Sequence, residues 1–137
     1  MTTNFSADRH NISSGGAYES IFGYSRAVRV GTDVHVSGTC APAGHEQSDA
    51  YTQTRAALAI IEKALANAGA SLAHVVRTVV YVRDIADAEA VERGHLESFD
   101  AIRPASTLVQ VTSMLRPWQK VEIEAYAKIE REQAVST

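Results

Sequence analysis

The sequence has 137 residues, a length typical of one domain, and its 45% apolar and 21% charged residues argue against a disordered chain. No apolar run approaches the roughly 20 residues of a membrane-spanning helix, and a net charge of −3 argues against a surface built to bind nucleic acid. The single cysteine, Cys40, excludes an internal disulfide and a multi-thiolate zinc site.

The N-terminal residues are polar and rich in Ser, Asn and Gly, so we expect residues 1–17 to form an irregular arm. This arm contains no apolar signal segment, and together with the single cysteine it predicts a cytoplasmic protein. A β-hairpin is predicted next, because short alternating runs at residues 25–30 and 34–38 flank the turn residues 31–33.

The clearest predicted element is a helix. Between residues 51 and 68 apolar side chains recur at alternating spacings of three and four, which places them on one helical face. Ser48 or Asp49 is the expected N-cap, and Gly69 is a suitable C-terminal stop.

A second helix is expected to begin after Asp84 or Asp87 and to end near residue 101. The strand predicted before it, residues 74–82, is apolar on both sides, as is typical of a strand covered on both faces. A further strand is predicted at residues 106–111.

The last predicted strand, residues 120–127, alternates strictly between apolar and polar side chains. The order β-β-α-β-α-β-β predicts an α+β fold in which two helices cover one face of a mixed sheet. The other face needs a cover, so we also expect self-association. The domain is expected to span residues 18–129, with a frayed tail at residues 130–137.

The sequence contains few motifs of known chemistry. The histidines include no pair at a short ligand spacing such as His-x-His, so we expect no metal site. There is no Gly-x-Ser-x-Gly motif and no glycine-rich nucleotide-binding loop. We therefore expect neither a serine nucleophile nor a cofactor.

Two carboxylates on the last predicted strand are candidates for acid–base chemistry. Glu122 and Glu124 project from the same face about 7 Å apart, and a buried carboxylate there can act as a general base toward water. A solvated polar face beside Lys120 and Lys128 explains the same pattern, so both interpretations stay open. Tyr24 is similarly open, because its ring suits either ligand stacking or plain packing.

Seven segments, taken in chain order, resemble a known family. They are GYSRAVRVG (23–31), VHVSGT (34–39), YTQTRAAL (51–58), ALANAGAS (64–71), VVRTVVYVRDIAD (75–87), RPASTLVQV (103–111) and VEIEAYA (121–127). The ordered set resembles the RidA/YjgF family, whose best-known members hydrolyse reactive enamines and imines to keto acids and ammonia. The resemblance implies a chorismate-mutase-like fold and a homotrimer with a central barrel and small-molecule clefts between subunits.

The resemblance also assigns roles to individual residues. It implies that Tyr24 lines the cleft, that Gly38 contacts the ligand through its backbone, and that Glu122 holds the attacking water. An asparagine usual on the second helix is absent, and Glu92 is the nearest residue to its position.

One departure from the family pattern concerns the arginine that pairs with the substrate carboxylate. Its position holds Ser106, and the backbone of Thr107 and Leu108 follows it along the strand. Losing one side of a buried charged pair costs about 2–5 kcal/mol, whereas a serine hydrogen bond contributes about 0.5–1.5 kcal/mol. Arg103 is a possible substitute or a surface residue that ends the helix, and Arg26 is a second candidate.

These residues leave three functions to compare. The first is hydrolysis of a C=N or enamine bond in a specialised substrate, since general imine deaminase activity is not expected without the arginine. The second is a non-catalytic binder or sensor that uses the same cleft. The third is an RNA-directed activity, as a ribonuclease or translation inhibitor, against which the net charge of −3 argues.

Overall fold

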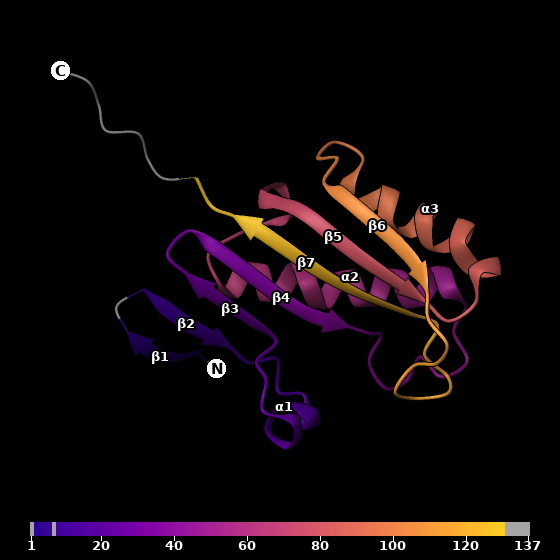
Figure 1. Ribbon diagram of the computed structural model, residues 1–137, viewed down its shortest axis with the longest axis horizontal. Coiled ribbons are helices and arrows are strands. Elements are labelled where there is room, and N and C mark those ends of the chain that lie inside the picture. Colours follow the sequence, from indigo (N-terminus) through magenta and orange to yellow (C-terminus); the bar gives the residue numbers. More distant parts are fainter. Residues whose placement is uncertain (1, 7, 131–137) are drawn as a thin grey trace.

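A sheet of seven strands, in the order β1-β2-β3-β4-β7-β5-β6, carries two long helices on one face (Figure 1). The computed structural model describes residues 2–6 and 8–130. The strands are β1 (Thr2–Ser6), β2 (Arg9–Ile12), β3 (Ala27–Val30), β4 (Asp33–Thr39), β5 (Val75–Val82), β6 (Ala105–Gln110) and β7 (Val121–Lys128). Neighbouring strands are antiparallel except β5 and β6, which are parallel.

The helices are α1 (Ala17–Phe22), α2 (Ala50–Asn67) and α3 (Ala88–Phe99), with 3-10 turns η1 (Leu72–His74) and η2 (Ile85–Asp87). Helix α3 crosses over between the parallel strands β5 and β6, as a parallel connection requires. The predicted α2 is confirmed at both ends. Asp49 Oδ1 accepts a hydrogen bond from the Thr52 amide at 2.8 Å, and Gly69 follows the helix with a φ of +83° that suits glycine.

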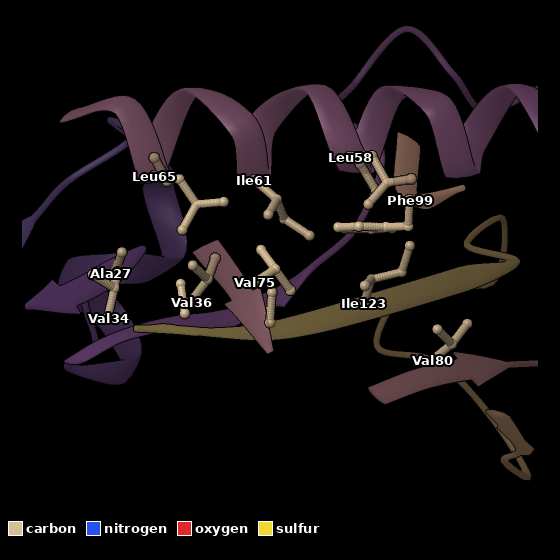
Figure 2. Close-up of a cluster of buried hydrophobic side chains, with 14 of the residues drawn as sticks. Ala27, Val34, Val36, Leu58, Ile61, Leu65, Val75, Val80, Phe99 and Ile123 are labelled. Atoms are coloured by element: carbon tan, nitrogen blue, oxygen red, sulfur yellow. The ribbon is translucent and has the colours of Figure 1, made fainter. Parts of the chain in front are cut away.

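The core lies between the helices and the sheet. Leu58, Ile61 and Leu65 of α2 point toward the strands, where they meet Ile123 and neighbouring apolar side chains (Figure 2). The spacing of these α2 residues is the periodicity that predicted the helix, and the alternation of β7 supplies their partners from the sheet. The predicted α+β fold, with two helices on one face of a mixed sheet, is therefore confirmed.

The prediction of an irregular arm at residues 1–17 is wrong. Strands β1 and β2 pair with each other and extend the sheet along the free edge of β3, and Ala17 begins α1. Ile12 is buried in the core. The polar composition hid these strands, because their backbone partner is an exposed sheet edge that the local sequence does not reveal. Residues 131–137 of the predicted tail lie outside the described residues.

Within the described part of one chain, the helices cover only one face of β5, so the cover expected for its second face stays a prediction of self-association. Val80 and Val82 of β5 are buried toward the helices, whereas Val79 and Tyr81, which alternate with them on the strand, are only half-buried. Glu122 and Glu124 of β7 lie on the face without helices and are half-buried. We call this surface the open face, and no other layer of residues 2–6 and 8–130 covers it.

Helices α2 and α3 are in close contact at Gly94, and this contact gives a testable prediction. A Cβ at Gly94 would lie 2.8 Å from Thr54 Cγ2, and Thr54 is held by a hydrogen bond from its Oγ1 to the Ala50 carbonyl. We expect Gly94→Ala to lower the free energy of unfolding by about 1–2 kcal/mol, despite the roughly 1 kcal/mol gained in helix propensity. Denaturant unfolding of the variant measures the change.

A double variant separates the steric cause from other effects. Adding Thr54→Ser removes the clashing methyl group and keeps the hydroxyl, so Gly94→Ala should cost less in that background. An unchanged cost in the Thr54→Ser background would contradict the steric explanation.

Candidate functional site

Glu122 is packed against the backbone of Gly38. A Cβ at Gly38 would lie 3.0 Å from Glu122 Cδ, so any other residue at this position would press on the carboxyl group unless Glu122 shifted. The register of β4 against β7 shifts between Val36 and Thr39, which places Gly38 in an irregular stretch of the strand. The two residues that the resemblance assigned to the cleft are therefore in contact.

A buried arginine connects Gly38 to Tyr24. Arg26 is 9% exposed, and its Nη1 donates to the Gly38 carbonyl at 2.8 Å and to Thr39 Oγ1 at 3.0 Å. Its Nη2 donates to the Tyr24 hydroxyl at 3.0 Å, and its Nε donates to Ser14 Oγ at 3.3 Å. Tyr24, Gly38 and Glu122 thus form one group, which we call the Gly38 group, and Arg26 holds it together.

These bonds bear on the suggestion that Arg26 substitutes for the missing arginine. Its guanidinium is engaged with the Tyr24 hydroxyl and the β4 backbone, so its observed contacts are structural. A planar guanidinium that binds several acceptors at once fixes their relative geometry. Arg26 therefore positions the Tyr24 ring beside Gly38.

Cys40 completes the surroundings of Glu122. Its thiol donates to Glu122 Oε1 at 3.4 Å. Burial and then the negative charge of Glu122 raise the pKa of the Cys40 thiol to about 12. The thiol is therefore a weak neutral hydrogen-bond donor to the carboxylate, and not a nucleophile.

A second group of residues lines a groove between α3 and β6. The groove has a volume of about 300 Å³, and we call it the α3–β6 groove. Its apolar lining includes Val80, Val91, Leu96, Phe99 and Leu108, and its polar lining is Glu92, His95, Arg103 and Ser106. Ser106, Leu108 and Arg103 were predicted to bind ligand, and the structure places these three at one cavity.

Arg103 lies at the rim of this groove. Its backbone has a φ of +57°, and its guanidinium donates to the carbonyl and the carboxylate of Asp100 at the end of α3. Its side chain is 72% exposed. The observed contacts match the surface interpretation of Arg103, which places it after the end of α3.

The Gly38 group and the α3–β6 groove lie on opposite faces of the sheet. Ser106 pairs with Thr78, and Thr78 pairs with Ala125, whose side chain is buried toward the helices. Glu122 pairs with Tyr81, three residues further along β5. Strand geometry therefore separates Ser106 from Glu122 by about 10 Å along the strands and about 10 Å across them. One chain does not bring the two groups together.

Thr107 differs from its neighbours Ser106 and Leu108. Because side chains alternate along a strand, Thr107 faces the open face, where its Oγ1 accepts a hydrogen bond from Arg77 Nη2 at 3.0 Å. Leu108 packs against the core.

Glu124 has surroundings that distinguish it from Glu122. Its Oε1 accepts from the Tyr81 hydroxyl at 2.5 Å, and its Oε2 accepts from the Tyr126 hydroxyl at 2.9 Å. The hydrogen bond to Glu124 is the main reason that the pKa of Tyr81 rises to about 12. Glu124 is thus engaged by two tyrosines of the open face, whereas Glu122 meets Gly38 and Cys40.

Sequence reasoning missed two features of these sites. It considered Cys40 only for disulfide and metal chemistry, because a sequence separation of 82 positions hides its contact with Glu122. It also missed the hydrogen bonds that join His95 and Thr78 to Ser106. The available signal was the strand spacing: residues i and i+2 share a face, so Thr78 lies on the same side as the apolar Val80.

Removing Arg26 should loosen the Gly38 group. We expect Arg26→Met to lower the free energy of unfolding by about 2–4 kcal/mol, because the buried Gly38 carbonyl loses its charged donor. Arg29→Met is a matched control, since Arg29 donates to the carbonyls of Gly31 and Ala68 but lies away from Glu122. Equal costs for the two variants in denaturant unfolding would contradict a special role for Arg26.

Within residues 2–6 and 8–130, no three His, Cys, Asp or Glu side chains converge as they would around a metal ion. Over the same part of the chain, no helix has both the length and the apolar character needed to cross a membrane.

Comparison with known proteins supports the resemblance seen in the sequence. Residues 15–129 match the family model described as Endoribonuclease L-PSP. The uncharacterized protein SCO2049 of Streptomyces coelicolor is 38% identical over 120 residues, which cover 84% of this chain and 90% of that protein. The 3-aminoacrylate deaminase RutC of Acinetobacter baylyi is 38% identical over 81 residues, which cover 59% of this chain and 64% of that protein.

A solved structure supports the same family assignment. The Mycobacterium tuberculosis protein Rv2704, described as a member of the highly conserved YjgF/YER057c/UK114 family, is 47% identical, with a TM-score of 0.83. The match covers 88% of this chain and 99% of that one. The coverage, the shared fold and the ordered sequence segments together show that this chain belongs to the YjgF/YER057c/UK114 family.

Proposed function

We propose that this protein binds a small metabolite in clefts between the subunits of a homotrimer and hydrolyses a C=N or enamine bond in it. The observation that carries the proposal is the Glu122 carboxylate, half-buried against Gly38 with a neutral thiol beside it. A relative named as a deaminase supports the reaction class. The reaction needs only water, so no cofactor is proposed. We place the protein in the cytoplasm, because a single cysteine is typical of a reducing compartment.

The proposed chemistry is addition of water followed by loss of ammonia. An enamine first takes a proton on carbon to become an iminium ion. Glu122 accepts a proton from water as the water oxygen bonds to the C=N carbon, and the electron pair of the C=N bond moves to nitrogen. Glu122 then passes this proton to the nitrogen. The carbinolamine collapses: its hydroxyl proton goes to the Glu122 carboxylate, the C–N bond breaks, ammonia leaves, and a carbonyl compound remains.

A second copy of the chain is required for one complete cleft. Glu122 and Ser106 lie on opposite faces of the sheet and well apart, so a ligand cannot touch both within one subunit. A neighbouring subunit can place its α3–β6 groove beside the Gly38 group. The open face, which carries half-buried Tyr81 and the exposed side chain of Val109, supplies a surface that association would cover.

Mixing two inactive variants tests this arrangement. Glu122→Gln removes the base from the Gly38 group, and Leu108→Trp blocks the groove. If each cleft takes one half from each of two subunits, random 1:1 reassembly gives about a quarter of the wild-type clefts and the same fraction of activity. Activity is measured as ammonia release, and light scattering gives the subunit number. No recovery in confirmed mixed oligomers would contradict the shared cleft.

One observation favours a second candidate, a non-catalytic binder or sensor. Ser106 stands where the resemblance implies an arginine, and its hydroxyl is hydrogen-bonded to Thr78. This position therefore supplies no cation to pair with a substrate carboxylate. Tight ligand binding with no hydrolysis of any imine or enamine would establish this alternative. Cleavage of RNA that survives Glu122→Gln would instead support the ribonuclease description.

A further inference from the structure

The α3–β6 groove is lined by one carboxylate, that of Glu92, and by one arginine, Arg103. Arg103 is engaged by Asp100, and this pair is neutral as a unit. Within residues 8–130, no hydrogen-bond or ion-pair partner is found for Glu92, which also lines the groove. The remaining lining is mainly apolar. The groove therefore carries an uncompensated negative charge, which opposes a carboxylate ligand and favours a cation.

The polar end of the groove is a chain of three side chains. His95 Nε2 lies 2.9 Å from Thr78 Oγ1, and Thr78 Oγ1 lies 2.7 Å from Ser106 Oγ. Thr78 is 0% exposed. Among the described residues, its hydroxyl is hydrogen-bonded only to His95 and Ser106. Ser106, at the other end, is exposed to the groove.

The single proton of the Thr78 hydroxyl gives this chain two arrangements. If His95 Nε2 donates to Thr78, Thr78 donates to Ser106 and the Ser106 proton is free for the ligand. If Thr78 donates to His95, Ser106 donates to Thr78 and offers the ligand only lone pairs. Burial lowers the pKa of His95, which keeps the imidazole neutral and both arrangements available. Ser106 can thus donate to an imine nitrogen or accept from an iminium N–H without a change of charge.

We propose that the α3–β6 groove binds imines that carry no carboxylate, with Ser106 hydrogen-bonded to the ligand nitrogen and Glu92 stabilising its positive charge. Such imines arise by two-electron oxidation of primary amines, so an amine-oxidising reaction would supply the substrate. Hydrolysis would then give an aldehyde or ketone and ammonia. The inference rests on the proposed hydrolysis for the fate of the ligand, but not for its binding.

A matched ligand pair tests the class directly. Leucine and 3-methylbutylamine share one carbon skeleton and differ only in the carboxylate. Titration of each into the protein, followed by the NMR signals of the His95 ring, is expected to show at least about tenfold tighter binding of the amine. Equal or tighter binding of leucine, or no binding of either, would overturn the inference.

Variants locate the preference in the groove. Glu92→Gln should weaken amine binding about two- to fivefold, whereas Glu89→Gln, the same change one turn earlier on α3 and outside the groove, should not. Ser106→Arg should reverse the preference toward leucine. Equal effects of Glu92→Gln and Glu89→Gln would also overturn the inference, because the preference would then reflect net charge alone.

The hydrolytic arm uses the imines made in situ from the same two compounds by an amine oxidase and an amino-acid oxidase. Faster ammonia release from the amine-derived imine supports both proposals. Tighter amine binding without any acceleration would contradict the hydrolytic function and leave the ligand class standing. Acceleration confined to the leucine-derived imine would support the hydrolytic function and contradict the proposed ligand class.

Discussion

Replacing Glu122 by glutamine is expected to lower the rate of imine hydrolysis by about 10²- to 10⁴-fold. Glutamine keeps the shape of the side chain against Gly38 but cannot take a proton from water. The fold should be unaffected, because Glu122 makes no ion pair among the described residues and its only hydrogen-bond partner there is the Cys40 thiol. Ammonia release with the best imine substrate measures the loss, and denaturant unfolding checks the fold.

Glu124→Gln is the matched control for this experiment. Glu124 lies two residues away on the same strand and face, but its carboxylate is engaged by Tyr81 and Tyr126. The control variant should therefore change the rate far less than Glu122→Gln. If both variants lose activity equally, or if Glu122→Gln keeps it, Glu122 is not the base.

The Cys40 thiol is expected to react very slowly with iodoacetamide in the folded protein. A pKa of about 12 leaves about a thousandfold less thiolate at pH 8 than an exposed cysteine has. Because Cys40 is the only cysteine in the sequence, the alkylation rate reports on this site alone. The rate is measured in native buffer and again in denaturant, where the full reactivity should return.

The Glu122→Gln variant connects this measurement to the site. Glutamine removes the negative charge that helps to raise the pKa of the Cys40 thiol, so alkylation should become faster while the fold is retained. Glu124→Gln should leave the rate nearly unchanged. A native thiol as reactive as a free one would show that Cys40 and Glu122 are not in the contact described, and would weaken the case for an enclosed carboxylate.

The long elements were predictable because their signals are local. Helix α2 repeats apolar residues with the period of a helix, and β7 alternates with the period of a strand. Asp49 and Gly69 mark the ends of α2 by their own backbone chemistry. The family resemblance rests on the same local segments, so the order of elements and the family could both be inferred before any contact was known.

The N-terminal strands show where local signals fail. Residues 2–6 and 9–12 have no apolar alternation that marks a strand, and their pairing depends on the free edge of β3, which lies further along the chain. Residues 74–82 differ, because their apolar character on both sides is a local signal. The helices of one chain cover one face of this strand, and the predicted self-association would cover the other.

The sequence alone predicted a small α+β protein of this family, and the family and the fold are confirmed. The placing of Ser106 at the family's arginine position stays a prediction from the resemblance. Only the tertiary structure showed that Glu122 lies on Gly38 beside Cys40, that Arg26 is hydrogen-bonded to the Gly38 carbonyl and the Tyr24 hydroxyl, and that Ser106 ends a hydrogen-bonded chain from His95. The reason is physical: periodicity is encoded in neighbouring residues, whereas a site forms where strands far apart in sequence pair and turn particular side chains to one face.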